Sequence, residues 1–182
     1  MRLERHACTL RTERREAFAS FARTGWVRAM FADMDALDRQ IVALLQGEGR
    51  ITLSALAERV RLSVSRCQRR VRALEDAGVL RGYRAVVDPA ALGLGFEVLA
   101  FATLDRPDSV AAFDAAVAAV PEVIEAQRLF GEPDYLIRVV SADLASYQSL
   151  YESVLVHLPG VEGLTSTIVM KHAVPLRPFP IS

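Results

Sequence analysis

The sequence is poor in cysteine and in long apolar runs. Its 182 residues include two cysteines, Cys8 and Cys67, which are too few for a disulfide framework. No apolar run reaches the ~20 residues that a membrane-spanning helix needs, and the N-terminus has no continuous apolar segment of the signal-peptide type. We therefore expect a reduced, cytoplasmic protein that is not a membrane protein.

Motifs of catalysis and of metal binding are lacking as well. The histidines His6, His157 and His172 are scattered, and none has a second metal ligand three or four residues away. The sequence has no Cys-x-x-Cys pair, no glycine-rich phosphate loop and no nucleophile elbow. We expect no cofactor, no metal site and no catalytic residue, and therefore a binding protein rather than an enzyme.

The net charge of zero hides an asymmetry between the two halves of the chain. Residues 1–88 contain 17 arginines and 11 acidic residues, a charge of +6, whereas residues 89–182 contain 5 basic and 11 acidic residues, a charge of −6. The length allows one large domain or two small ones. The asymmetry indicates a nucleic-acid-binding half joined to a half with a different task.

Two helices separated by a tight turn are predicted between Ile51 and Gly78. The first has apolar residues at i, i+3, i+4 and i+7 from Leu53, and Arg61-Leu62 forms the turn. Ser63 is well placed as the N-cap of the second helix, because its hydroxyl can accept a hydrogen bond from the first turn. The buried stripe of the second helix consists of Cys67, Val71 and Leu74.

The outer face of the second helix is polar and basic. At ~100° per residue, Ser65, Arg69 and Arg72 point away from the buried stripe, whereas Arg70 lies closer to it and is predicted to form a structural ion pair. A capped helix with such a face is what a helix-turn-helix needs to enter a major groove; the alternative is a solvated face on an ordinary bundle helix. The candidate DNA-contacting residues are Ser63, Ser65, Arg66, Gln68, Arg69 and Arg72.

The remainder of the first domain surrounds this helix pair. An amphipathic helix begins after Asp35, and Gly78 is a good C′ glycine for the last helix. The β-branched segment 83–87 predicts a short hairpin or wing. Asp88-Pro89 and the glycines that follow indicate a linker, so we place the first domain with its linker at residues 34–95.

The second half alternates between strand and helix patterns in the order β-α-β-β-α-β. Strands are predicted at 96–104, 123–130, 135–140 and 165–174, and helices at 109–120, with Asp108 as N-cap, and at 144–158. This order predicts an α+β, ferredoxin-like domain over residues 96–182, with both helices on one face of an antiparallel sheet. Dimerisation usually covers the other face of such a sheet.

One turn of the second half, Gly-Glu-Pro-Asp-Tyr at 131–135, carries an acidic side chain between two strands. Asp134 there could receive an ammonium ligand beside free backbone N–H groups. Taken alone, however, a turn aspartate is more often structural.

The order of these motifs from about Asp35 onward resembles the Lrp/AsnC (feast/famine) family of prokaryotic transcription regulators. The resemblance rests on the helix-turn-helix, the GEPDY turn and the LPGV helix end together. It implies a winged helix-turn-helix for double-stranded DNA, with residues 63–72 as the recognition helix. It also implies a ferredoxin-like RAM domain that dimerises, assembles into rings and binds amino acids between dimers. The effector-site candidates that it implies are Gly131, Asp134 and Tyr135, with Thr165, Ser166 and Thr167 on the last strand.

Two features depart from the pattern of the family. Residues 1–33, with a charge of +3, are longer than the few residues usual there. A four-residue apolar spacing from Phe18 permits a helix, and translation from Met34 is another possibility; we expect a disordered or mis-started extension rather than a functional arm. Pro133 stiffens the turn, at a position where other residues are common.

Two alternative functions fit the same architecture. Sirohaem decarboxylases resemble it, but they carry a histidine-centred HNY-type stretch where this chain has RLFGEPDYLIR, which contains no histidine. An architectural DNA-binding protein without an effector is the second alternative, and equal binding to all DNA sequences would support it. We expect a sequence-specific transcription regulator that responds to an amino acid.

Overall fold

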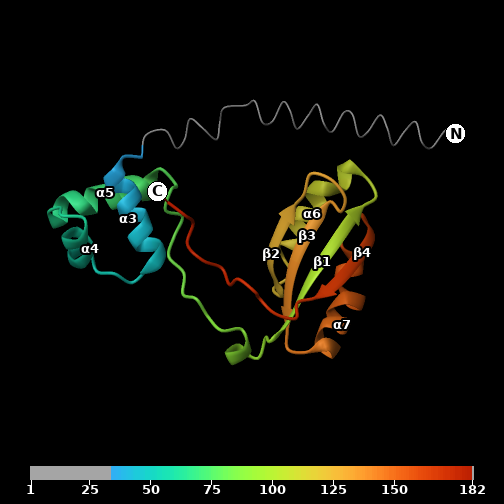
Figure 1. The fold of residues 1–182 in the computed structure, drawn as a ribbon. Coiled ribbons are helices and arrows are strands. Elements are labelled where there is room, and N and C mark those ends of the chain that lie inside the picture. The colour runs from blue at the N-terminus through green and yellow to red at the C-terminus, as the bar shows by residue number, and fades with distance from the viewer. Residues whose placement is uncertain (1–33, 182) are drawn as a thin grey trace. The chain divides into compact units, whose positions relative to one another are not determined.

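The computed structural model describes residues 34–181 as two compact units (Figure 1). The first unit contains residues 34–84 together with 177–181, and the second is Ala85–Leu176. This division differs from the predicted one in two places, because the linker belongs to the second unit and the end of the tail to the first. The predicted extension at 1–33 lies outside the described residues.

The first unit is a bundle of three helices. They are α3 (Ala36–Gly47), α4 (Leu53–Arg59) and α5 (Val64–Asp76). Each begins after a residue whose side chain accepts a hydrogen bond from an N–H of the first turn, namely Asp35, Thr52 and Ser63. The predicted stripes meet in one core made of Ile41, Val42, Leu45, Leu56, Ala57, Val60, Cys67 and Leu74. The helix-turn-helix prediction is therefore confirmed, as is the N-cap role of Ser63.

The segment after α5 forms no strand. Gly78 ends the helix as predicted, and the N–H groups of Val79 and Leu80 both donate to the carbonyl of Leu74. Within the described chain, however, residues 83–87 form no strand, so the short hairpin predicted there is wrong. The β-branched residues have no partner strand, and the Tyr83 hydroxyl instead donates to Glu75 Oε1 over 3.0 Å.

The second unit is a four-stranded antiparallel sheet with two helices. Its strands are β1 (Phe96–Leu104), β2 (Val123–Arg128), β3 (Tyr135–Ser141) and β4 (Val161–Ile168). The helices are α6 (Val110–Val117) and α7 (Leu144–Ser153). The strand order β2-β3-β1-β4 confirms the predicted α+β, ferredoxin-like arrangement (Figure 1).

The two faces of the sheet differ in cover. Val98, Ala100 and Ala102 of β1 are fully buried and pack in one core with Phe113 of α6 and Tyr147 of α7. Both helices therefore lie on this face. The alternate residues of β1 are only half-buried, and they point to the other face, which we call the open face of the sheet.

Three predicted boundaries in the second unit are wrong. Asp108 is not the N-cap of α6, because a 3-10 turn, Pro107–Ser109, precedes the helix. The second helix ends at Ser153 and is followed by a separate 3-10 turn, Leu155–His157. The last strand is β4 rather than 165–174, because pairing with β1 sets its limits.

One end of the sheet is closed by a tight contact at Gly160. This glycine has φ of +75°, and a Cβ there would lie 2.2 Å from Ser109 Cβ. Its carbonyl accepts from the N–H of Asp105 over 2.8 Å, and Asp105 in turn accepts from the Ser109 hydroxyl. Only glycine fits this position, which joins the starts of α6 and β4.

Candidate DNA-binding face and effector turn

The outer face of α5 is exposed along its length. Ser65, Gln68, Arg69 and Arg72 line a shallow groove of about 320 Å³ on this face. Arg66 is exposed beside them. Five of the six residues predicted to contact DNA are thus presented to solvent on one helix, and the sixth, Ser63, lies at its start.

The arginines of α5 fall into two kinds. In the described part of the chain, no carboxylate forms an ion pair with Arg66, Arg69 or Arg72. Arg70 Nη1, in contrast, lies 2.7 Å from Asp35 Oδ2 and 2.7 Å from Asp38 Oδ1. The predicted structural ion pair of Arg70 is confirmed, and it ties α5 to the start of α3.

This ion pair shifts the pKa values of Arg70 and Asp35 in opposite directions. Hydrogen bonds to Asp38 and then Asp35 raise the pKa of Arg70 above its ordinary value. The N–H of Asp38 lowers the pKa of Asp35, and Arg70 lowers it further. The pair therefore stays ionised near neutral pH and holds α5 against the start of α3.

Ser63 has a local partner for its hydroxyl. Its Oγ accepts from the N–H of Arg66 over 3.4 Å and lies 3.3 Å from Ser65 Oγ. The hydroxyl thus satisfies the first turn of α5, which is where a recognition helix approaches base edges.

The predicted effector turn joins β2 to β3. Asp134 Oδ2 accepts from the N–H of Leu104 over 2.9 Å, and the Asp134 N–H donates to the Ala102 carbonyl over 3.0 Å. These bonds fix the turn against the end of β1. Gly131 has φ of +148°, and nothing lies within 4 Å of the place that a Cβ would take. The backbone at Gly131 is therefore open to a small molecule.

Two predicted effector residues point away from this turn. The buried Tyr135 hydroxyl donates to Asp114 Oδ1 over 2.6 Å, and burial together with this bond raises the pKa of Tyr135 to about 12. Ser166 Oγ lies 2.6 Å from the hydroxyl of Tyr147 on α7. Both side chains serve the helix-covered face, so the structure does not bring them to the turn.

The two predicted threonines lie on the open face of the sheet. Thr165 is opposite Phe101 and Thr167 is opposite Leu99, and both threonines are exposed. Strand β1 separates them from the strand that follows the turn, a distance of roughly 10 Å at the usual strand spacing. Within one protomer, they and the turn do not form one site.

A cluster that the sequence did not predict lies at the other end of the sheet. Glu97 accepts from Arg138 Nε and lies 2.8 Å from His172 Nε2. The hydrogen bond from Arg138 is the main cause that lowers the pKa of Glu97. These residues are 41 and 75 positions from Glu97 in the sequence, so local spacing gives no signal for them.

Among the described residues, none of the helices combines the length and apolarity that a membrane crossing requires. In the same residues, no group of three histidine, cysteine or acidic side chains is placed to hold a metal ion.

The chain matches two known domain families along the described residues. The winged helix-turn-helix DNA-binding family matches residues 34–81, and the Lrp/AsnC ligand binding domain family matches residues 97–179. Together these matches cover α3 to α5 and nearly the whole of the sheet unit.

Curated relatives and solved structures agree with these matches. The DNA-binding transcriptional activator DecR of Escherichia coli K12 is 35% identical over 150 residues, 81% of this chain and 99% of the relative. The leucine-responsive regulatory protein of Rhizobium meliloti is 38% identical over 143 residues, 76% of this chain and 90% of the relative. A Neisseria meningitidis transcriptional regulator in complex with L-Met is 34% identical, with a TM-score of 0.76 over 81% of this chain and 96% of its own.

These relatives are named as regulators that bind DNA or respond to an amino acid, and none of the three is named as an enzyme. Identity of 35% across nearly the full length of DecR extends the likeness over both units. The chain therefore belongs to the Lrp/AsnC family of transcription regulators, with a DNA-binding helix-turn-helix domain followed by a ligand-binding domain.

Proposed function

We propose that this regulator works in the cytoplasm as a homodimer or larger ring, reads a specific DNA sequence through α5, and responds to an amino acid at the 131–134 turn. The observation that carries the DNA assignment is the contrast on α5. Arg70 is fully engaged by Asp35 and Asp38, whereas Arg69 and Arg72 are exposed without a carboxylate partner among the described residues.

The exposed side chains of α5 suit both parts of DNA recognition. Arginine donates two parallel N–H groups to the O6 and N7 atoms of guanine, and glutamine can pair with adenine in the same way. We assign base reading to Gln68, Arg69 and Arg72. Ser63, Ser65 and Arg66, at the start of the helix, are placed to bond phosphate or base edges.

Selection from a pool of random DNA tests sequence specificity directly. We expect the wild-type protein to enrich a partly palindromic motif, because a dimer presents two recognition helices related by a two-fold axis. The variant Arg69→Ala/Arg72→Ala should enrich no motif or a degenerate one. If the wild-type protein enriched no motif, the architectural alternative would replace this proposal.

An amino acid is the ligand class that the turn suits. Its ammonium needs an acceptor, and its carboxylate needs N–H donors a few ångströms away. Asp134 Oδ2 is engaged by Leu104, and no hydrogen bond from the described residues reaches Oδ1. The open backbone at Gly131 is placed to offer donors. The L-Met bound by the Neisseria regulator belongs to the same chemical class.

A second copy of the chain is the partner that we assign to the open face of the sheet. Half-buried Leu99, Phe101 and Leu136 lie on this face and are not covered by α6 or α7. A ligand held between subunits can bias assembly: a preference of ~1–3 kcal/mol for one oligomer changes its population 5–150-fold.

The charge of Asp134 gives a sharp test of the effector site. In Asp134→Asn, the amide oxygen can still accept from Leu104, but the charge that attracts an ammonium is lost. We expect this variant to keep its fold and its DNA binding. The amino acid that shifts the thermal stability or the oligomer size of the wild type should have no such effect on the variant. Asp134→Ala should lose the response too, and should also loosen the turn.

Glu132→Gln is the matched control, because it neutralises an exposed carboxylate of the same turn. It should respond like the wild type. A normal response in Asp134→Asn would place the effector site elsewhere.

A further inference from the structure

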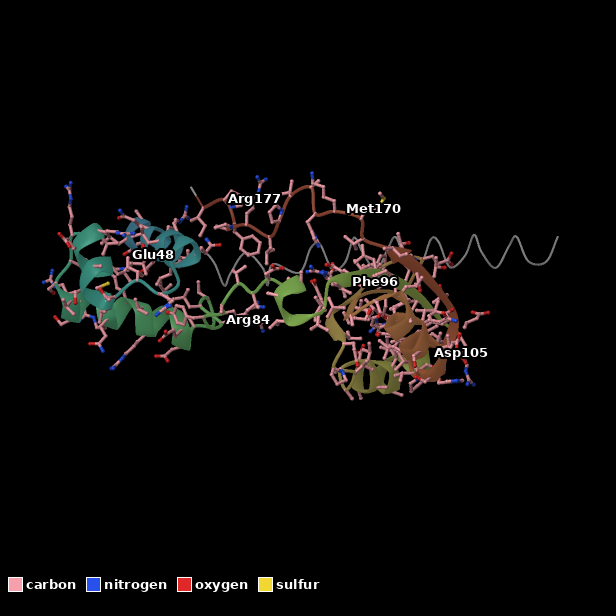
Figure 2. The ribbon with its side chains drawn as sticks, turned by 90° about the horizontal axis from the view of Figure 1, so that it is seen from below. Glu48, Arg84, Phe96, Asp105, Met170 and Arg177 are labelled. Atoms are coloured by element: carbon pink, nitrogen blue, oxygen red, sulfur yellow. The ribbon has the colours of Figure 1, made fainter. Side chains whose placement is uncertain are left out.

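The tail of the chain returns to the DNA-binding unit. After β4 ends at Ile168, the chain runs on through Met170 and Arg177, and its last described residues lie beside α3 (Figures 1 and 2). The N–H of Phe179 donates to Gln46 Oε1 over 2.8 Å, and Gln46 Nε2 donates back to the Phe179 carbonyl at 3.5 Å. One side-chain amide of α3 thus pairs with both backbone groups of one tail residue.

The same tail residues add to the apolar packing of the first unit. Ile181 packs against the core of the three-helix bundle. With Met34, Ala36 and Ala43 it also lines a groove of about 620 Å³ on α3. The amide pair and the Ile181 contact are separated by one residue, so the tail is held by a polar and an apolar anchor side by side.

Three prolines restrict the backbone of this segment even before it docks. Pro175, Pro178 and Pro180 fix their own φ angles and bias the residue before each of them to extended backbone. Less conformational entropy is therefore lost when the segment docks. Within residues 178–180, only Phe179 has a backbone N–H, because its two neighbours are prolines. The side-chain oxygen of Gln46 accepts the hydrogen bond from this N–H.

The first residues of the tail, 169–172, are fixed on the second unit. The N–H of Val169 donates to the Glu97 carbonyl over 2.9 Å, and His172 Nε2 lies 2.8 Å from the Glu97 carboxylate. The tail is thus attached at Glu97 by its root and at Gln46 by its end.

We propose that residues 177–181 act as a strap: they dock reversibly on α3 through Gln46 and Ile181, and so give the DNA-binding unit a second tether to the ligand-binding domain beside linker 85–95. One flexible tether leaves a domain free to reorient, whereas two tethers at different points restrict it. In a dimer, the strap would limit how far apart the two recognition helices can sit. The docking itself is independent of the proposed function, and only the DNA readout below rests on it.

Hydrogen exchange of the full-length protein tests the docking. Gln46→Ala removes the amide anchor, and we expect about 2–10-fold faster exchange at the Phe179 N–H, the range that loss of one hydrogen bond implies. Gln148→Ala is the control, since Gln148 is an exposed glutamine of α7 whose side chain donates to Glu152 and has no hydrogen bond to the tail. Equal exchange in wild type, Gln46→Ala and Gln148→Ala would overturn the strap.

A variant that ends at Leu176 tests the tether. Lacking the strap, it should expose α3 around Ala43 to exchange, and a synthetic peptide of residues 173–181 added in excess should restore protection. Failure of both the exposure and the restoration would also overturn the proposal.

Half-site spacing gives the functional readout. On DNA selected by the wild type, inserts of 2–5 base pairs between the half-sites should weaken wild-type binding at least tenfold. For the variant that ends at Leu176 the loss should be less than threefold, because its DNA-binding units can reorient. Equal spacing dependence in both proteins would refute the tether. If the wild type bound no preferred DNA, the proposed function would fail, and the exchange result would still decide the docking.

Discussion

The two units of this regulator use their arginines in opposite ways. In the first unit, three arginines on one face of α5 have no carboxylate partner among the described residues, and Arg70 on the same helix has two. In the second unit, Arg106 pairs with Asp105 and Arg138 with Glu97. The basic half of the sequence therefore keeps part of its charge available, whereas two of the three arginines of the second unit form internal ion pairs.

The difference explains how a chain with no net charge can bind a polyanion. A hydrated, unpaired arginine adds little to the stability of the fold, but it can displace counterions from DNA when it meets a phosphate. The second half has a charge of −6, which is unfavourable for DNA binding, so we expect the first unit to supply the DNA contacts. Substitutions of free and paired arginines should consequently act on different properties of the protein.

The largest effect is expected for the free arginines. Arg69→Ala should weaken binding by ~1–3 kcal/mol if the side chain reads a guanine, and the double variant Arg69→Ala/Arg72→Ala by ~2–6 kcal/mol. A phosphate contact would instead lower the salt slope by ~1 for each residue. Fluorescence anisotropy at several salt concentrations separates the two cases.

Thermal stability should be unchanged in this variant, because neither side chain has an ion-pair partner in the described chain. Arg106→Ala, in the second unit, is the control and should bind DNA normally. Wild-type affinity in the double variant would contradict the assignment of α5 to the groove.

The next effect concerns the paired arginine of the same helix. Arg70→Ala leaves Asp35 and Asp38 without their shared cation, and it should lower the free energy of unfolding of the first unit by ~1–2 kcal/mol, a value reduced for partial solvent exposure. Urea denaturation followed by circular dichroism measures this loss. Arg66→Ala should change stability by less than ~0.5 kcal/mol. A smaller loss in Arg70→Ala than in Arg66→Ala would contradict the comparison.

A pH-dependent effect of about 1 kcal/mol or less is expected for the paired charge of the second unit. Arg138 holds the pKa of Glu97 below its ordinary value of 4.5, so the ionised carboxylate stabilises the fold at neutral pH. This stabilisation is lost as the pH falls from about 4.5 through the lower folded pKa. Glu97→Gln should be less stable at pH 7 and should lose less stability on acidification.

Urea denaturation between pH 7 and pH 3 tests this, with Glu162→Gln as control, because Glu162 is exposed on β4. Parallel pH profiles for Glu97→Gln and the wild type would show that the ion pair adds nothing.

An effect of similar size concerns a hydrogen bond to an exposed carboxylate in the second unit. Tyr135→Phe removes the donor to Asp114 and should cost ~0.5–1.5 kcal/mol. In an alkaline absorbance titration, the wild-type protein should show a phenol that ionises only at a pKa of about 12, and the variant should lack that step. Retention of the step in the variant would assign it to another tyrosine.

The elements that the sequence predicted correctly are those whose pattern is local. The predicted strand 96–104 coincides with β1 because its alternating residues face a core and an open face. The cap at Ser63, the stripe through Cys67 and the side position of Arg70 all follow from helix geometry. Gly160 was expected at a helix end, but its contact with Ser109 depends on a residue 51 positions earlier and has no local signal.

The predictions that are wrong concern segments whose structure depends on pairing with residues far away in the sequence. Strand β4 ends at Ile168 because that residue lies opposite Val98, and Val169 uses the Glu97 carbonyl near the start of β1. The β-branched residues after Ile168 have no strand beside them to pair with, so they cannot extend β4. Segment 83–87 forms no hairpin for the same reason. For the candidate effector site, Asp134 was predicted from its place in the turn. Tyr135 and Ser166 were predicted from the family resemblance, which does not show which way their side chains point.

The contact between Gln46 and Phe179 also has a consequence for the time course of synthesis. The two residues are 133 positions apart, and protein synthesis adds ~5–20 residues per second, so the tail follows α3 by roughly 7–27 s. During that interval the three-helix bundle has to remain folded without Ile181, while the whole ligand-binding domain is being made. The DNA-binding domain is thus finished early, and the segment that we expect to restrain it is finished only after the ligand-binding domain.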